Sequence, residues 1–502
     1  MNAKKRVILN SAVLYAKIIA SMSLTLVSVP MILKSMGASD YGLYNLMAGV
    51  VGMLAFLNNA LTVSSQRYLS VSMGKGNNHE INLIYNTSFF LHLVLGIGVI
   101  LLLECGSLFI DRLNIEPDRI QVANIIYQLL IATTFIRIVS VPYDAIINAH
   151  EDMVTFAVIE IIDSLLLFVI AVSLQFVPYD KLVFYGGSMC LVSFVNIILK
   201  SGWCSLKYRK YRINIKKYRK ELLLKEMSGF AWWNMFGGLS VIGRNQGVAV
   251  IINIFLGTIV NAAYGLANQI NGALSSFSGT FQRAINPQLM KSEGMKDRER
   301  LFRITIVTSR YSVIALSFFA IPLIITMPDV LQIWLHGDIP IYTMELSRCI
   351  LIMTIVYQFS TGIMSAIQAA GDIKKYQLTM GCIILMNLPL SYFFLKLGFP
   401  AYSVTIGFVL LEILSLVVRI RMAKLLIGMP SGNFVKKVIV PTLLYISLSF
   451  VCGSLASVLC QTALPRIIIT GLTSCGVFFL MFCFFDLSKS QRVQILKAIK
   501  VK

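Results

Sequence analysis

Long apolar segments recur along the whole chain and give the first prediction. Residues 156–177, 304–327 and 440–460 are close to the length of about 20 residues with which a helix crosses a bilayer. By apolar length, fourteen helices are predicted near residues 8–33, 42–65, 82–106, 122–143, 153–176, 182–203, 229–255, 259–282, 304–327, 347–368, 375–395, 401–422, 438–460 and 467–486. We therefore expect an all-α polytopic membrane protein whose two chain ends lie on the same side.

The composition agrees with this pattern. Hydrophobic residues occupy 57% of the 502 positions and charged residues only 13%, against roughly 25% charged residues in soluble domains. The apolar stretch after Lys4, Lys5 and Arg6 runs past the usual length of a signal's hydrophobic region and lacks a small-residue cleavage site. We therefore expect the first helix to be retained.

Basic residues are distributed unevenly between the predicted loops. With a cytoplasmic N-terminus, most of the 44 Lys and Arg residues fall in loops on the cytoplasmic side, as the positive-inside rule requires. We expect a multi-pass protein of the bacterial inner membrane with both termini in the cytoplasm. This topology and attraction to anionic membrane lipids account for the net charge of +21, so nucleic acid is not an expected partner.

The most basic segment, residues 207–225, separates two groups of six predicted helices. We expect an N-terminal six-helix lobe at 1–204, a basic cytoplasmic linker at 205–228, a second six-helix lobe at 229–424, and two further helices with a cytoplasmic tail at 425–502. Parallel repeats of this kind are a transporter architecture, with the substrate site between the lobes.

Two pairs of short matches support a repeat. Ala145, Ile146 and Ala149 match Ala366, Ile367 and Ala370 at an offset of 221 positions, and Tyr41, Gly42 and Leu43 match Tyr264, Gly265 and Leu266 at 223. The alternative is that small and aromatic residues recur at helix ends because of composition alone. Similar offsets from unrelated segments favour the repeat.

Enzymatic chemistry is not expected from this chain. The loops are too short for a soluble catalytic domain or a P-loop, and His79, His92, His150 and His336 are dispersed without metal-ligand spacing. We therefore expect no catalytic residue, no metal site and no cofactor.

The few charges within predicted helices are the candidates for function, because each costs at least about 2.5 kcal/mol at bilayer depth. Arg244 is the sharpest case, since it opens the polar run Arg244, Asn245, Gln246 near the middle of a helix. Three further cations are candidates for a cavity that binds an anion: Lys17, Arg137 and Arg310. The alternative for these three is that they extend to a membrane interface.

Carboxylates and amides complete the set of candidates. Glu160 and Asp163 share a helical face and Glu412 lies at mid-depth, so they are candidates for H⁺ or Na⁺ coupling, with charge balancing between helices as the alternative. Amides donate and accept hydrogen bonds and so suit sugar hydroxyls. The candidates are Asn59, Asn268 and Asn271 together with Asn245 and Gln246, and helix–helix contacts are the alternative. Because guanidinium groups suit phosphate, the cations favour a phosphorylated lipid as substrate.

The sequence resembles the polysaccharide transporters, the Wzx-type flippases of O-antigen and capsule biosynthesis in the multidrug/oligosaccharidyl-lipid/polysaccharide exporter superfamily. Residues 28–70, 264–289 and 366–376 carry the resemblance, beginning SVPMILKSMG, YGLANQINGA and AIQAAGDIKKY. It implies a MATE-like fold that flips an undecaprenyl-diphosphate-linked oligosaccharide by alternating access, coupled to an ion gradient. Arg244 and Lys17 best fit the cationic lumen of such flippases.

The resemblance also implies partners and rivals. A flippase of lipopolysaccharide or capsule synthesis would work beside a polysaccharide polymerase and chain-length machinery. Two alternatives belong to the same superfamily: a multidrug and toxin cation antiporter, which uses acidic cavity residues, and a lipid II flippase, which also has fourteen helices. Glu160, Asp163 and Glu412 keep the antiporter open, whereas Arg244 disfavours it.

Overall fold

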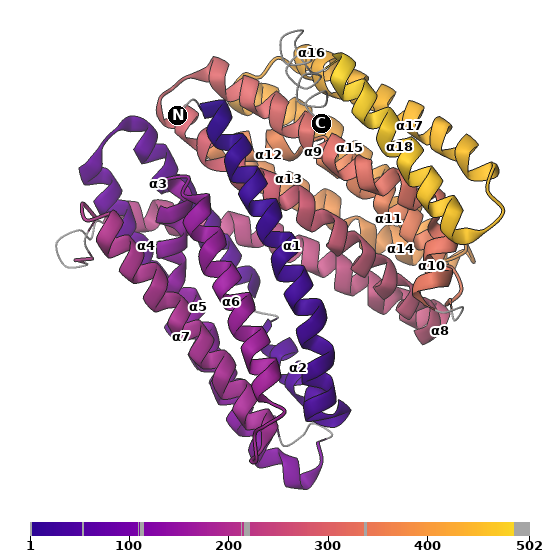
Figure 1. The fold of residues 1–502 in the computed structure, drawn as a ribbon. Coiled ribbons are helices and arrows are strands. Elements are labelled where there is room, and N and C mark those ends of the chain that lie inside the picture. Colours follow the sequence, from indigo (N-terminus) through magenta and orange to yellow (C-terminus); the bar gives the residue numbers. More distant parts are fainter. Residues whose placement is uncertain are drawn as a thin grey trace, which may run out of the picture. The chain divides into compact units, whose positions relative to one another are not determined.

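The computed structural model describes residues 3–52, 55–108, 110, 115–211, 213–214, 221–335 and 339–485 of the chain. Some side chains inside helices, including that of Asn59, are not described, and His336 and the predicted tail at 486–502 lie outside the described residues. Every regular element within these ranges is helical. This confirms the predicted all-α fold (Figure 1).

The helices of the first half are α1 (Ala3–Met36), α2 (Ala38–Gly52), α3 (Ala55–Lys75), α4 (Asn78–Ser107), the short η2 (Pro117–Arg119), α5 (Ile120–Ala149), α6 (Met153–Ser173) and α7 (Lys181–Lys207). Then follow α8 (Glu221–Gly294), α9 (Arg298–Ile325), α10 (Met327–Trp334), α11 (Thr343–Gln358), α12 (Thr361–Ala370), α13 (Lys374–Leu385), α14 (Asn387–Lys396) and α15 (Tyr402–Ile427). The chain continues with α16 (Ser431–Phe434), the π-helical η3 (Val435–Ile439), α17 (Val440–Val458) and α18 (Ala463–Phe485).

Eleven helices of the described residues are long and apolar enough to cross a membrane, or twelve if α11 and α12, bent by 46°, form one span. This is fewer than the fourteen predicted, and two segments account for the difference. The segment predicted at 42–65 falls in α2 and the more polar α3, neither of which is among the eleven, and residues 53–54 between them are not described. The helices predicted at 229–255 and 259–282 are joined in α8.

Helix α8 cannot be a single straight span. Its 74 residues would extend about 110 Å at 1.5 Å per residue, whereas the hydrocarbon core of a bilayer is about 30 Å thick. Gly257 interrupts it with φ 80° and ψ −177°, a backbone conformation that is open to glycine and strained for other residues. Gly257 lies between the two predicted helices, so the sequence placed this break correctly.

The chain forms two compact units, and each is described here by itself. Unit 1 contains residues 1–239 and 283–298, and unit 2 contains residues 240–282 and 299–502. Both ends of α8 thus belong to unit 1 and its middle to unit 2. The lobes predicted from the repeat divide the chain at other residues, and that division stays a prediction.

In unit 1, helices α4 to α7 pack side by side and α1 lies along α6 (Figure 1). The ends of α8 are packed closely here. Ser64 Oγ donates to the carbonyl oxygen of Met227 at 2.9 Å, and a Cβ atom at Gly294 would collide with the carbonyl oxygen of Val71. At the other end of the unit, Arg119 bridges Asp40 and Asp180.

The turn between α5 and α6 ties several helices of unit 1 together. Glu151 is buried with φ 61°, and it accepts hydrogen bonds from Gln288 and Lys291, each at 2.5 Å. Asp152 accepts from Lys207 at 2.6 Å, Thr155 at 2.9 Å, Tyr208 at 3.0 Å and Trp203 at 3.2 Å. The turn therefore fixes the α5–α6 end of unit 1 against the end of α7 and the last turns of α8.

Asp152→Asn is expected to lower the free energy of unfolding by about 1–3 kcal/mol at neutral pH, because it removes the charge that these donors stabilise. Burial raises the pKa of Asp152, but the hydrogen bonds from Lys207, Thr155, Trp203 and Tyr208 outweigh it and hold this pKa below its usual value. A lowered pKa means that the stabilisation is complete above the unfolded value of about 3.9 and is lost as the pH falls through the folded value.

Melting temperatures measured from pH 7 to pH 3 in detergent will test this. The difference between wild type and Asp152→Asn should be constant above about pH 5 and should shrink below about pH 4. The exposed Asp118→Asn serves as the control. A difference that does not change with pH would contradict the role of the Asp152 charge.

In unit 2, α17 and α18 form a hairpin attached to the rest of the unit (Figure 1). Ser449 Oγ donates to the carbonyl oxygen of Ser474 at 3.0 Å, and a Cβ atom at Gly453 would collide with Ser474. Arg466, at the start of α18, binds Asp329 of α10 at 3.0 Å. The two C-terminal helices are therefore an integral part of unit 2.

The elements of the two halves recur at nearly constant offsets. Helices α4 and α9 begin 220 positions apart at Asn78 and Arg298, and α6 and α13 begin 221 apart at Met153 and Lys374. Helices α7 and α15, which begin at Lys181 and Tyr402, are also 221 positions apart. These offsets match those of the sequence repeat and indicate two six-helix halves followed by the α17–α18 hairpin.

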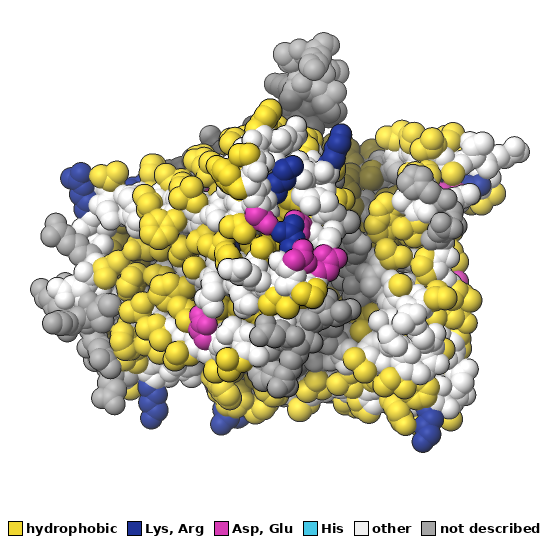
Figure 2. All heavy atoms as spheres, turned by 90° about the horizontal axis from the view of Figure 1, so that it is seen from below, with side chains coloured by type: hydrophobic (Ala, Val, Ile, Leu, Met, Phe, Trp, Pro, Cys, Tyr) yellow, Lys and Arg dark blue, Asp and Glu magenta, His cyan; other side chains and the backbone are white. Residues whose placement is uncertain are grey.

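The exposed surface is largely apolar. Leu101, Ile254 and Leu472 are each more than 60% exposed, and hydrophobic side chains cover much of the face in Figure 2, where acidic and basic side chains are few. Apolar exposure on this scale is unfavourable in water and favourable in lipid. Together with the membrane-spanning helices, it identifies a multi-pass membrane protein.

Candidate functional site

Unit 1 contains a cavity of about 510 Å³ lined mostly by polar side chains. The volume is within the range of ligand-binding pockets. The lining residues are Asn58, Thr62 and Gln66 of α3; Arg137, Ser140, Val141, Asp144 and Asn148 of α5; Phe156, Glu160, Asp163, Ser164 and Leu167 of α6; Met189, Val192, Ser193, Asn196 and Lys200 of α7; and Arg283 of α8.

Helical periodicity brings these residues together. On α5, Arg137, Ser140, Asp144 and Asn148 are spaced three or four residues apart and so share one face. The lining residues of α3, α6 and α7 follow the same spacing. Each helix therefore turns a polar stripe toward the cavity.

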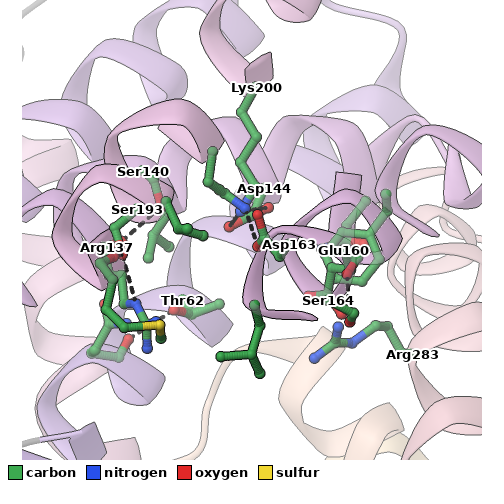
Figure 3. Close-up of a pocket in the computed structure, with 18 of the residues that line it drawn as sticks. Thr62, Arg137, Ser140, Asp144, Glu160, Asp163, Ser164, Ser193, Lys200 and Arg283 are labelled. Atoms are coloured by element: carbon green, nitrogen blue, oxygen red, sulfur yellow. Dashed lines mark hydrogen bonds and ion pairs between the residues drawn. The ribbon is translucent and has the colours of Figure 1, made fainter. Parts of the chain in front are cut away.

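Three carboxylates and three cations line the cavity, which is therefore of mixed charge. Lys200 Nζ lies 2.8 Å from the carboxylate of Asp144, and Glu160 is paired with Lys17 of α1. Asp163 accepts a hydrogen bond from Asn196 at 2.5 Å. Figure 3 shows Lys200, Asp144 and Asp163 together at the middle of the view. A cavity lined mainly by cations, as the sequence predicted, is thus not what unit 1 contains.

Two guanidinium groups in the cavity have no carboxylate partner among the described residues. Arg137 Nε lies 3.4 Å from the hydroxyl of Ser193, and the guanidinium carbon of Arg283 lies 4.9 Å from the ring centre of Phe156. They lie on opposite sides of the view in Figure 3. Both arginines are exposed rather than buried, so each guanidinium is available to an anionic ligand that enters the cavity.

Several buried polar atoms of the cavity lack a hydrogen-bond partner within the described part of the chain. These are Asn58 Oδ1, Gln66 Nε2, Asn148 Oδ1 and Asp163 Oδ1. Buried polar groups in folded proteins are almost always satisfied. The cavity therefore offers both acceptors and donors to a polar ligand or to water.

Arg244, the leading candidate from the sequence, belongs to unit 2 and is not among the residues that line this cavity. Its Nε donates to Asn245 Oδ1 at 3.1 Å, Nη1 lies 3.8 Å from Met353 Sδ, and its guanidinium carbon lies 5.2 Å from the ring centre of Phe408. All of these partners are neutral, and Arg244 makes no ion pair within the described residues. No carboxylate of the described residues is therefore paired with this half-buried arginine.

Glu412, predicted as an ion-coupling candidate, is buried in an ion pair with Arg419 of the same helix, α15. Arg419 also donates to Ser360 Oγ at 2.9 Å, at the bend between α11 and α12. Only 2% of Arg419 and 5% of Glu412 is exposed. These contacts favour the alternative interpretation of Glu412, that it balances a charge within the unit.

Arg310, Asn268 and Asn271 belong to unit 2 and are not among the residues that line the cavity. Arg310 donates to Tyr445 OH at 3.0 Å and to the carbonyl oxygen of Lys437 at 3.3 Å, so it anchors the C-terminal hairpin. Asn268 donates within its own helix to Tyr264, whereas Asn271 accepts from Thr354 of α11 at 2.6 Å. The hydrogen bonds of Arg310, Asn268 and Asn271 favour the structural alternatives for these residues. Gln246 is exposed, and the side chain of Asn59 is not described.

Sequence reasoning did not single out Asp144, Lys200 and Arg283 for the cavity. Asp144 and Arg283 lie just outside predicted helices, and Lys200 lies near the end of one, where a charge ordinarily faces an interface. The polar stripes were the signal that could have identified them. A search for polar residues spaced three or four apart on neighbouring helices would have found Asp144 and Lys200.

The comparisons with known proteins agree with this architecture. The model of the family described as "Polysaccharide biosynthesis protein" matches residues 7–293. A crystal structure of a MATE mutant is 14% identical with a TM-score of 0.74, covering 85% of this chain and 97% of its own. An outward-facing multidrug resistance MATE family transporter of the MOP superfamily is also 14% identical, with a TM-score of 0.75 over 85% and 96% of the two chains.

A third structure is a MOP superfamily transporter from Pyrococcus furiosus, 14% identical with a TM-score of 0.72 over 85% of this chain and 96% of its own. Its description states that reverse polarity of its binding pocket suggests a different function. No curated protein matches the chain. At such identities the structures establish the fold, which is that of MATE transporters. The family match spans more than half of the chain, which therefore belongs to the polysaccharide biosynthesis protein family and has a MATE-like fold.

Proposed function

We propose that the protein is a flippase that moves an undecaprenyl-diphosphate-linked oligosaccharide across the bacterial inner membrane for O-antigen or capsule biosynthesis. The observation that carries the proposal is the polar cavity of unit 1 in a protein of the polysaccharide biosynthesis family. Its amides and hydroxyls suit the hydroxyl groups of sugars, because both kinds of group donate and accept hydrogen bonds. Its two guanidinium groups without carboxylate partners suit phosphate.

Arg244 in unit 2 supports the same substrate class. A guanidinium held only by an amide, a thioether and an aromatic ring retains its capacity to bind an anion. Lys17, the other favoured cation, is paired with Glu160 and supports the proposal less.

Coupling to an ion gradient is part of the proposal, and Asp163 is its best candidate residue. Its described hydrogen-bond partner is the amide of Asn196 rather than a cation, and its second oxygen is unpartnered. Such a carboxylate can take up H⁺ or coordinate Na⁺ in a low-dielectric site. Glu160 is a weaker candidate because Lys17 already balances its charge.

Deleting the gene in its own organism tests the function. The deletion strain should lose a surface polysaccharide and should accumulate lipid-linked repeat units on the cytoplasmic side of the membrane, and the wild-type gene should restore export. An unaltered surface polysaccharide would overturn the proposal. A defect in peptidoglycan with normal surface polysaccharide would instead favour a lipid II flippase.

The second candidate function is export of cationic drugs, which the three carboxylates of the cavity favour: Asp144, Glu160 and Asp163. Two of these, Asp144 and Glu160, are already paired with lysines. If the deletion strain becomes sensitive to cationic drugs and keeps its normal surface polysaccharide, this second function is the correct one.

A further inference from the structure

The two unpaired arginines of the cavity lie at different depths in unit 1. The guanidinium of Arg283 is stacked on Phe156, three residues into α6, near the α5–α6 end of the unit. Arg137 is twelve residues before the end of α5 at Ala149, and its neighbour Ser193 is fourteen residues before the end of α7 at Lys207. Phe156 is three residues from this end of the unit and Arg137 is twelve residues from it. The difference of nine residues corresponds to about 13 Å, so the two cations are separated along the helix axes.

One diphosphate cannot neutralise both arginines. Its two phosphates share a bridging oxygen, so both are confined to one end of a cavity of this length. In a lipid-linked sugar the diphosphate is attached directly to the membrane-embedded chain and remains at the level of the lipid headgroups. That level corresponds to the α5–α6 end of the unit, where the guanidinium of Arg283 contacts Phe156. Arg137 can then bind only a part of the ligand that extends deeper into the cavity.

The stretch between the two arginines is charge-balanced and rich in hydrogen-bonding groups. The pairs Lys200–Asp144 and Lys17–Glu160 cancel their charges, and Asp163 with Asn196 offers acceptors and donors. This middle region suits neutral sugar hydroxyls. At its far end lies Arg137, whose described hydrogen bond is a 3.4 Å contact to the hydroxyl group of Ser193.

We propose that the transported oligosaccharide is acidic: Arg283 binds the diphosphate of the carrier and Arg137 binds a carboxylate or phosphate on a sugar deeper in the cavity. This inference rests on the proposed function and names its substrate class. A guanidinium donates two parallel hydrogen bonds to such a group, which makes Arg137 a specificity-determining residue.

The test measures equilibrium binding of three probes to the full-length protein in lipid nanodiscs. The probes are undecaprenyl diphosphate, undecaprenyl-diphosphate-linked trisaccharide ending in glucuronic acid, and the same trisaccharide ending in glucose. Wild type should bind the glucuronic acid probe about tenfold more tightly than its glucose twin, as one charge-assisted hydrogen-bonding pair would provide. Arg137→Gln should remove this difference, so that the two trisaccharide probes bind with equal affinity.

Arg283→Gln should weaken all three probes by a similar factor and leave the tenfold ratio intact. Arg137→Lys keeps the charge without the planar fork and should retain part of the ratio, so the test remains decisive if Arg137→Gln fails to fold. Lys396→Gln, an exposed cation of α14, is the matched control and should change nothing.

The outcomes separate this inference from the proposed function. Equal affinity of wild type for the glucuronic acid and glucose probes would overturn the acidic substrate while leaving a lipid-linked oligosaccharide flippase intact. A tenfold ratio that survives in folded Arg137→Gln would also overturn it. Failure to bind any of the three probes would overturn the proposed function itself.

Discussion

Arg244→Ala is expected to reduce translocation of the lipid-linked sugar about a hundredfold while the protein remains folded in the membrane. A bidentate contact of guanidinium with phosphate comprises two charge-assisted hydrogen bonds, together worth about 3 kcal/mol, and alanine removes both. The fold should tolerate the change, because the neutral partners Asn245, Met353 and Phe408 lose no ion pair. Surface polysaccharide in a complemented deletion strain, at equal protein level, is the measurement.

Two variants make the Arg244 result interpretable. Arg244→Lys keeps a positive charge but loses the planar fork, so it should restore transport only in part. Arg421→Ala removes an arginine of the same unit at an exposed position of α15 and should leave transport unchanged. Wild-type surface polysaccharide in the Arg244→Ala strain would exclude this arginine from the transport path.

The membrane helices could be predicted from the sequence because bilayer thickness imposes a length on every apolar segment. The break at Gly257 was also predictable, since residues 256–258 separate two segments of spanning length and glycine permits the positive φ found there. The bend of 46° between α11 and α12 was not predicted, because residues 347–368 read as one apolar run.

The site was less predictable because it depends on which charged side chains form ion pairs with one another. Lys17 and Glu160 are 143 positions apart, and their pairing follows from the packing of α1 along α6, which no local pattern encodes. Because such pairs could not be foreseen, the sequence predicted a cationic cavity from Arg244, Lys17, Arg137 and Arg310. The structure brings Arg137 into the cavity, neutralises Lys17 and assigns Arg310 to the C-terminal hairpin.

Arg419 shows a related limit. It lies near the end of the segment predicted at 401–422, where a basic residue ordinarily indicates an interface. In the structure it is almost fully buried and is paired with Glu412, seven residues or about two turns earlier on the same helix. The seven-residue spacing was visible in the sequence, but the burial that makes the pair significant depends on how α11 and α12 pack against α15.

Glu412→Gln is expected to lower the free energy of unfolding by about 3–5 kcal/mol, because it leaves Arg419 buried without its counter-charge. Replacing both members, as Glu412→Leu with Arg419→Met, should recover most of this loss, since a well-packed apolar pair has no desolvation penalty. Thermal unfolding of wild type, Glu412→Leu, Arg419→Met and the double variant in detergent gives the coupling between the two residues. Asp372→Asn, an exposed carboxylate of unit 2, is the control and should stay within about 0.5 kcal/mol of wild type.

The same variant distinguishes the two roles considered for Glu412. A structural carboxylate predicts lower stability for Glu412→Gln and a transport rate that falls only with the amount of folded protein. A coupling carboxylate predicts normal stability and transport that no longer responds to an imposed H⁺ or Na⁺ gradient in proteoliposomes. Because Arg419 and Ser360 already engage this site and fix it at the α11–α12 bend, we expect the first result, with ion coupling left to Asp163.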